Sequence, residues 1–249
     1  VCIRLYSEED YERREEFTPP EILRSNLAEV ILRMLSLRLG DMETFPFVDR
    51  PGARSVKDGF DVLTELGAIT RDQDRVRLTP RGRLMARLPL DPRIARMMLE
   101  ARQEGCDKEV GVIAAALGIQ DPRQRPADRA AQADEAHQSF RDPESDFLTL
   151  LNLWGQYHRA RKTLRTQSRM RAFCKERFLS FARMREWWDV HEQITTILAE
   201  EALEFDTGSH ATQARDDSRY ARIHRAVLSG FLSNIAVQKE KALYRATRG

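Results

Sequence analysis

The stretch from residue 66 to residue 82, LGAITRDQDRVRLTPRG, decides the fold of the first part of this chain. Gly67 is typical of a residue that ends a helix, because glycine adopts the left-handed conformation without a steric penalty. Two short runs with apolar and β-branched residues follow, 68–70 and 76–78, with a polar turn between them. Thr79 and the proline after it are typical of a helix start. The stretch therefore predicts a helix end, a two-stranded hairpin and a new helix.

Helical patterns flank this hairpin on both sides. Thr18 opens the capping pattern Thr-Pro-Pro-Glu, and apolar residues recur behind it at helical spacing until Gly40. Ser55 opens a second helix, which Gly67 ends, and a third, short helix follows the hairpin. Helix, helix, hairpin and helix in this order predict a winged helix over residues 18–89.

Residues 90–205 carry no strand signal and predict a helical bundle. Two amphipathic helices are expected to end at Gly105 and Gly118, and a polar stretch with prolines, 120–145, follows them. Ser145 then begins another helix, and aromatic residues at helical spacing continue as one or two long helices to the end of this region. Core packing is the expected role of these aromatic side chains.

The last part of the chain changes character twice. Residues 206–218 are rich in Asp, Ser, Thr and Gly and predict a flexible linker. A helix near 219–228 follows, and residues 231–244 predict the first strands of a β domain that is cut short. The predicted fold class is therefore mainly α, with a winged helix, then a helical bundle, then a truncated β C-terminus.

The composition is that of a folded protein with internal cores. The chain has 249 residues, of which 41% are hydrophobic and 32% charged, and this suffices for two or three small domains. A formal net charge of +2 does not by itself indicate a partner. The three cysteines have no C-x-x-C spacing and the five histidines no H-x3-5-H spacing. Neither a disulfide framework nor a metal site is therefore predicted, and a reducing, cytoplasmic compartment is expected.

The start of the chain and its hydropathy bear on targeting. No apolar run approaches the roughly 20 residues that a membrane span needs, so no membrane partner is expected. The first residues, Val-Cys-Ile-Arg-Leu-Tyr, lack the basic end and the apolar stretch of a signal peptide. Val1 stands where a complete chain would begin with Met, which indicates a piece of a longer protein.

Residues 134–137 spell Asp-Glu-Ala-His, the ATPase signature of the DEAH-box helicases. A catalytic box of this kind follows a buried strand and works with a P-loop that holds ATP and magnesium. The chain has no G-x-x-x-x-G-K-[ST] sequence, and the tetrapeptide follows a polar, alanine-rich stretch. We therefore expect a solvated helix here, no catalytic residue in this chain, and no ATP hydrolysis by the chain alone.

Other motifs, which run in order along most of the chain, nonetheless resemble the DEAH-box RNA helicases, most closely their bacterial HrpA-like branch. They are C-I-R-L-Y-S-E at 2–8, T-P-P-E-I-L-R-S-N-L at 18–27, F-P-F-V-D at 45–49, L-G-A-I at 66–69, L-T-P-R-G at 78–82, L-P-L-D-P-R at 88–93, G-C at 105–106, I-Q-D-P-R at 119–123, S-D-F-L at 145–148 and L-S-G-F-L-S-N-I at 228–235. The first is similar to the end of that family's second RecA-like domain, and the last to the lead into its OB fold.

The resemblance implies the accessory region of an RNA helicase that hydrolyses nucleotide while it moves along a single strand. It implies the tail of the second RecA-like domain at 1–17, the winged helix at 18–89 and a helical ratchet domain at 90–205. Behind the linker, it implies the lead into a truncated OB fold at 219–249. ATP and Mg²⁺ would be cofactors of the parent protein, bound outside this chain, and the winged helix would act mainly as a hub between modules.

The largest block of one charge sign, residues 155–175, is the first candidate for RNA contact. It contains no acidic residue, so it could neutralise phosphates, with Tyr157 and His158 as candidate stacking groups. Its basic residues are Arg159, Arg161, Lys162, Arg165, Arg169, Arg171 and Lys175. The alternative is a solvated helix end and loop that happen to be basic.

Two further candidates lie elsewhere. Arg123, Arg125 and Arg129 belong to the loop after the second bundle helix, where Asp121 and Asp128 offset their charge. The alternative for this loop is that it packs on a neighbouring domain. Arginines in and behind the hairpin could contact duplex DNA, as a winged helix does, or could form a domain interface. These arginines are Arg71, Arg75, Arg77, Arg81, Arg83 and Arg87.

The leading hypothesis is a non-catalytic region that grips single-stranded RNA and couples this grip to the ATPase motion of the RecA-like domains of the same chain. A monomer is expected. Two alternatives stay open from the sequence: a stand-alone winged-helix regulator that binds duplex DNA, and a protein-docking scaffold.

Overall fold

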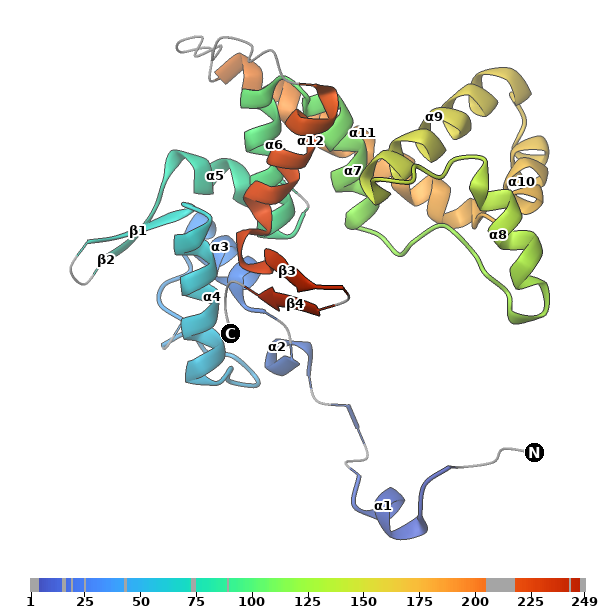
Figure 1. The fold of residues 1–249 in the computed structure, drawn as a ribbon. Helices are drawn as coiled ribbons and strands as arrows, with labels where there is room; N and C mark the ends of the chain where they lie inside the picture. Colours follow the sequence, from blue (N-terminus) through green and yellow to red (C-terminus); the bar gives the residue numbers. More distant parts are fainter. Residues whose placement is uncertain are drawn as a thin grey trace.

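A computed structural model describes residues 5–14, 17–18, 20–24, 26–42, 44–72, 75–88, 90–204, 218–241 and 243–246 of the chain. These residues form twelve α-helices, two short 3-10 helices and two small antiparallel sheets (Figure 1). The prediction of a mainly α fold is confirmed. The linker expected at 206–218 lies outside the described residues except for its last residue.

The N-terminal helices differ from the single long helix expected between Thr18 and Gly40. After the short helix α1 (Glu8–Glu12), two helices form, α2 (Glu21–Arg24) and α3 (Ala28–Leu37). The side chain of Asn26 accepts a hydrogen bond from the Ala28 amide at 2.8 Å. Such a local bond competes with the helix ladder, so the prediction of one helix was wrong. The helix also ends earlier, at Arg38 with a φ of 55°.

The second helix of the winged helix, α4 (Ala53–Glu65), also begins earlier than expected. Gly52 is its N-cap, and the side chain of Ser55 lies inside the first turn, so the predicted start at Ser55 was wrong. Its predicted end is confirmed, since Gly67 adopts a φ of 66° just behind the helix.

The hairpin and the helix behind it form where the sequence predicts them. Strand β1 (Ile69–Asp72) pairs antiparallel with β2 (Arg75–Leu78). The Thr79 hydroxyl accepts a hydrogen bond from the Gly82 amide at 2.9 Å, which caps α5 (Pro80–Arg87). It also donates to the carbonyl of Gly67 at 2.8 Å. One side chain therefore ties the end of α4 to the start of α5 and closes the hairpin between them.

Three helices cross at the centre of the molecule (Figure 1). Helices α6 (Pro92–Glu104) and α7 (Asp107–Leu117) form a hairpin at Gly105, which has a φ of 66°. Helix α12 (Arg219–Gly230) packs along α6, although more than a hundred residues separate them in sequence. A Cβ on Gly230 would collide with the backbone carbonyl of Arg93. The absence of a side chain there lets the two helices touch backbone to backbone.

The remaining helices lie to one side of this crossing (Figure 1). A 3-10 turn (Ala127–Arg129) and α8 (Ala130–Gln138) interrupt the polar stretch, which is followed by α9 (Asp146–Leu164), α10 (Gln167–Glu176) and α11 (Phe181–Glu204). The Ser145 hydroxyl accepts a hydrogen bond from the Leu148 amide at 3.2 Å, which confirms the predicted start of α9.

Helix α11 contributes the tryptophans Trp187 and Trp188 to the core of the α7–α11 region. Trp187 is fully buried, and its indole nitrogen donates to the carbonyl of Val112 on α7 at 2.9 Å. Trp188, the next residue, is only half-buried, because neighbouring residues of a helix face different directions. Phe178 lies outside the helices, between α10 and α11, with a φ of 51°. The expected helical spacing of the aromatic residues is therefore interrupted at this turn.

The C-terminal residues form the expected strands. A 3-10 turn (Leu232–Asn234) leads from α12 to β3 (Ala236–Glu240), which pairs antiparallel with β4 (Leu243–Ala246). The described residues of both strands are exposed. Within the described part of the chain, no helix is long and apolar enough to cross a membrane.

Candidate nucleic-acid interface

The basic block at 155–175 covers the second half of α9 and most of α10. Arg165 has a φ of 55° and ends α9, and the Thr166 hydroxyl caps α10 through the Arg169 amide at 3.4 Å. The two helices therefore turn sharply within the block, so its charges line a short helical hairpin at one end of the molecule (Figure 1). We call this surface the basic face; its members are Arg159, Arg161, Lys162, Arg165, Arg169, Arg171 and Lys175.

The side chains of the basic face are all exposed. Among the described residues, no carboxylate lies within ion-pair distance of any of them. Two of them lie over aromatic rings instead: Arg161 is 3.8 Å from the ring centre of Trp188, and Arg171 is 5.3 Å from that of Phe181. The positive charge of this surface is thus available to an anionic ligand.

The two aromatic neighbours expected to stack on bases have different fates. Tyr157 is 1% exposed and packs against Phe173, and its burial raises the pKa of its hydroxyl. A buried ring cannot meet a base, so the prediction for Tyr157 was wrong. His158 is half-buried, with its ring 5.5 Å from that of Trp188. Partial burial and the charges of Lys162 and Arg161 lower the pKa of His158, so its ring is neutral at pH 7.

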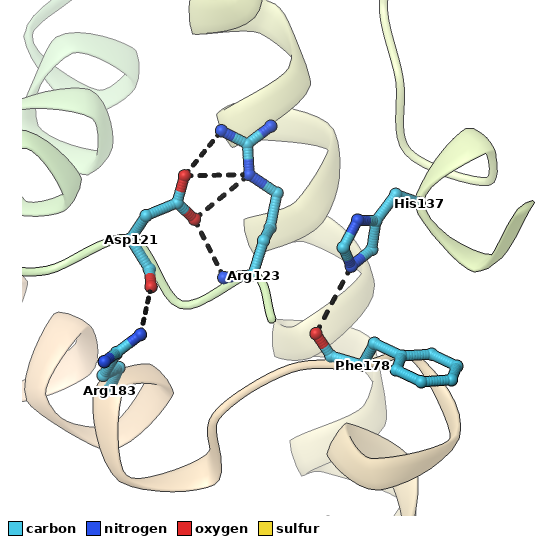
Figure 2. A network of polar contacts seen from close by, with 5 residues as sticks. All are labelled: Asp121, Arg123, His137, Phe178 and Arg183. Carbon is cyan, nitrogen blue, oxygen red and sulfur yellow. Dashed lines mark hydrogen bonds and ion pairs between the residues drawn. The ribbon is translucent and has the colours of Figure 1, made fainter. Parts of the chain in front are cut away.

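Arg123, the first arginine of the second candidate, is held by a carboxylate two residues away (Figure 2). Its Nη2 and Nε atoms donate to Asp121 at 2.7 and 3.1 Å, and its backbone amide donates to the same carboxylate at 2.8 Å. Burial alone would raise the pKa of Asp121, but the hydrogen bonds and charge of Arg123 outweigh it, and the pKa is lowered. The charge of Arg123 is therefore paired with a carboxylate of the same loop, at the surface of the fold.

Arg125 is paired in the same way, with a residue of α8. Its Nε and Nη2 atoms donate to the two carboxylate oxygens of Asp134 at 2.7 and 2.8 Å. This hydrogen bonding lowers the pKa of Asp134. Although both side chains are exposed, the bidentate geometry matches the two charges to each other rather than to a ligand.

The loop that carries these arginines is bound to the turn between α10 and α11. The carbonyl of Phe178 accepts a hydrogen bond from the Gln124 amide at 2.8 Å. It also accepts one from Nε2 of His137 at 3.3 Å (Figure 2). Arg183 on α11 donates to the carbonyl of Asp121 at 2.8 Å. These hydrogen bonds hold the loop against the turn between α10 and α11 and the start of α11.

The Asp-Glu-Ala-His tetrapeptide lies on α8, as the sequence predicts. Asp134 holds Arg125, and His137 contacts the Phe178 carbonyl and the ring of Phe140, whose centre is 5.3 Å away. Glu135 is exposed. The side chains of the tetrapeptide that make contacts fasten α8 to the neighbouring loop and turn.

The arginines of the hairpin are exposed but partly engaged. Arg71 lies 3.9 Å from Asp61 and over the ring of Phe60, and Arg83 donates to the carbonyl of Leu78 at 3.2 Å. Arg87 lies 3.8 Å from Glu200, which connects α5 to α11. Arg75, Arg77 and Arg81 are exposed and have neither an ion pair nor a side-chain hydrogen bond among the described residues.

Metal and thiol chemistry find little support in the described ranges. No group of three or more His, Cys, Asp or Glu side chains there could hold a metal ion. Cys106 and Cys174 are buried, and burial raises the pKa of each thiol to about 11. Neither would be a thiolate at neutral pH.

Two family models match the chain. The model described as "Helicase associated domain (HA2), winged-helix" matches residues 61–90, and the one described as "Helicase associated domain (HA2), ratchet-like" matches residues 91–150. The matched residues include the hairpin with α5 and the helices from α6 to the start of α9.

The whole chain is similar to parts of known helicases. It is 44% identical over 251 residues to the ATP-dependent RNA helicase HrpA of Escherichia coli (strain K12), which covers 100% of this chain and 19% of that protein. It is 44% identical over 253 residues to the HrpA homolog of Haemophilus influenzae, with the same coverage. It is 32% identical over 248 residues to the probable ATP-dependent RNA helicase DHX35 of Homo sapiens, which covers 99% of this chain and 33% of that protein. The chain spans about a fifth to a third of the length of these relatives.

Proposed function

This chain belongs to the HrpA-like DEAH-box helicases, of which it is the winged-helix and ratchet-like accessory region, and on this premise we propose that it grips single-stranded RNA. The observation that carries the proposal is the basic face, on which exposed cations have no carboxylate within reach among the described residues. Binding by such a surface releases counterions, so affinity should fall steeply as salt rises.

The proposal includes a motor partner. The RecA-like domains of the same polypeptide would bind ATP and Mg²⁺ and hydrolyse the nucleotide, while this region holds the strand. A single hydrophobic core that runs from α3 to α12 supports mechanical coupling, because a force on one helix reaches the others through packed side chains.

The proposal keeps the division of the chain made from the sequence. Residues 1–17 end the second RecA-like domain, 18–89 form the winged helix, 90–205 form the ratchet domain, and 219–249 lead into an OB fold. The protein acts as a monomer in the cytoplasm, and the unpaired, buried Cys106 and Cys174 fit a reducing compartment.

A fluorescence titration of the chain with single-stranded RNA and with duplex DNA, over a salt series, tests this function. We expect tighter binding to the single strand and a linear fall of log affinity with log salt. Tighter duplex binding would instead favour a winged-helix regulator that uses Arg75 and Arg77. The absence of binding to either nucleic acid would favour a docking scaffold.

A further inference from the structure

The ring of Trp188 lies between two side chains of α9. On one side it stacks on Trp154, with ring centres 5.3 Å apart and an interplanar angle of 16°. The guanidinium of Arg161 lies 3.8 Å from the centre of the Trp188 ring. Trp154 and Arg161 are seven residues apart on one helix, about 10 Å along its axis, which leaves room for a ring between them. Trp188 therefore has one face on an aromatic neighbour and the other under an exposed cation.

We propose that this second face of Trp188 is a stacking site for one unpaired nucleobase of the bound strand, and that Arg161 occupies the place of the base in the free protein. The inference rests on the proposed function and names the ligand group that this part of the basic face takes. Arg161 can leave the ring because it is exposed and has no ion-pair partner among the described residues.

Replacement of Arg161 by a base should be favourable both for the ring of Trp188 and for the displaced guanidinium. A base has a larger flat face than a guanidinium, and stacking of a base on an aromatic ring is stronger than an exposed cation–π contact. The displaced guanidinium gains a phosphate instead, because Lys162 and Arg165 beside it attract the backbone of the strand. Every base has such a face, so the site should accept any base.

The surroundings of the ring suit an uncharged aromatic ligand. His158 lies 5.5 Å from Trp188, and His191 lies 4.8 Å from Trp154, measured between ring centres. Burial lowers the pKa of His191, and burial with the charges of Lys162 and Arg161 lowers that of His158. Both imidazoles are therefore neutral at pH 7, whereas Arg161 and Lys162 are exposed and could meet a phosphate.

The second arginine–ring pair of the basic face serves as a matched control. Arg171 lies over Phe181, but at 5.3 Å rather than 3.8 Å, and no aromatic stacking partner of Phe181 is found among the described residues. Trp188→Leu and Phe181→Leu thus each remove one ring under an arginine of the same surface. Only Trp188→Leu removes a ring that also stacks on a second aromatic ring, that of Trp154.

The test compares a short single-stranded RNA of mixed sequence with an abasic oligonucleotide of the same length and phosphate count. We expect the chain to bind the base-containing strand at least about fivefold more tightly. Trp188→Leu should reduce this ratio to about one with the salt slope unchanged, and Phe181→Leu should leave it intact. Arg161→Gln should keep the ratio and lower the slope by about 0.7.

Circular dichroism and urea unfolding establish that each variant is folded, and Trp188→Phe, which keeps a ring, should retain part of the ratio. Equal binding of the two oligomers to the unmodified chain would overturn the stacking site and leave the proposed function standing. So would an unchanged ratio in a folded Trp188→Leu chain. The absence of binding by both oligomers would overturn the two proposals together.

Discussion

Two regions of this molecule are rich in exposed arginine, and they differ in what lies beside the arginines. In the loop before α8, Arg123 is bound to Asp121 and Arg125 to Asp134, each through at least two hydrogen bonds. On the basic face, no acidic residue occurs in the sequence from 155 to 175, and none of the described residues places a carboxylate within ion-pair distance. In the first region the arginine charge is paired with carboxylates of the fold, whereas on the basic face it has no ion-pair partner among the described residues.

The comparison shows that a count of basic residues does not measure available charge. Arg123 and Arg161 both carry a guanidinium group, yet that of Arg123 has a fixed anionic partner and that of Arg161 lies over an aromatic ring. An arginine that lies over a ring can give up this weak contact for a phosphate at little cost in free energy. An arginine in a bidentate ion pair must first break two charge-assisted hydrogen bonds.

The largest expected effect comes from reversing charges on the basic face. The variant Arg159→Glu, Lys162→Glu, Arg165→Glu should lose roughly tenfold to hundredfold in affinity for single-stranded RNA at 0.1 M salt. Its salt slope should fall by about 2, because three phosphate contacts are lost. Titration over a salt series measures both quantities.

A control for this variant carries the same change of charge on α4 and in the segment before it, as Arg50→Glu, Arg54→Glu, Lys57→Glu. These three side chains are exposed and far from the basic face in sequence. Equal losses in the two triple variants would mean that net charge, and no particular surface, governs binding.

The loop should respond in stability rather than in affinity. Arg123→Gln leaves the Asp121 side chain, which is 51% exposed, with fewer donors, so the free energy of unfolding should fall by up to about 1 kcal/mol. The affinity for RNA should stay within about twofold of that of the unmodified chain, because Arg123 is paired with Asp121 and contributes less than one full phosphate contact. Urea unfolding and RNA titration of the same preparation measure the two quantities. A loss of RNA affinity without a loss of stability would show that Arg123 binds RNA, which contradicts the prediction.

Acid should lower the stability of the folded chain, because it protonates the Asp121 carboxylate that pairs with Arg123. The pKa of Asp121 lies below its ordinary value of 3.8 in the folded chain, so its ionised form stabilises the fold above that pH. The stabilisation is lost as pH falls through the lowered pKa, because the unfolded chain takes up the proton first. Unfolding midpoints of the unmodified chain and of Asp121→Asn should therefore converge as pH falls from about 5 to 3. Parallel curves would show that the pair contributes nothing.

The smallest effect is expected at Glu135, an acidic residue that pairs with no arginine among the described residues. Glu135 is exposed on α8 and has no ion-pair partner among the described residues. Glu135→Gln should leave the ATPase rate of the full-length parent protein and the stability of this chain unchanged, because the tetrapeptide around it fastens a surface helix. A marked fall in the ATPase rate would restore the catalytic meaning of these four letters.

Local signals in the sequence predicted the parts of the fold that depend on neighbours along the chain. Gly67, Thr79 and Ser145 act within a few residues, so the hairpin and the start of α9 could be read directly. Asn26 shows the limit of this reading, because its side-chain hydrogen bond outweighs an apolar pattern that continues across it.

The candidate site was predicted less completely, because its decisive contacts are distant in sequence. The basic residues themselves could be read as a block, but the burial of Tyr157 depends on its packing against α10. The stack of Arg161 on Trp188 joins residues of two helices, and no local pattern encodes it. The spacing of Trp154 and Arg161 on one helix face was the only available hint.

The backbone contact between Gly230 and Arg93 has a consequence for how this region can vary among proteins. Helix α12 is fixed on α6 by that contact, by Arg225, which donates to Glu104 at 2.6 Å, and by Arg93, which donates to the Ser233 hydroxyl at 3.0 Å. The strands β3 and β4 therefore take their position from α6, whatever route the chain follows between α11 and α12. A change of length between α11 and α12 that keeps these contacts should therefore leave the C-terminal strands in place.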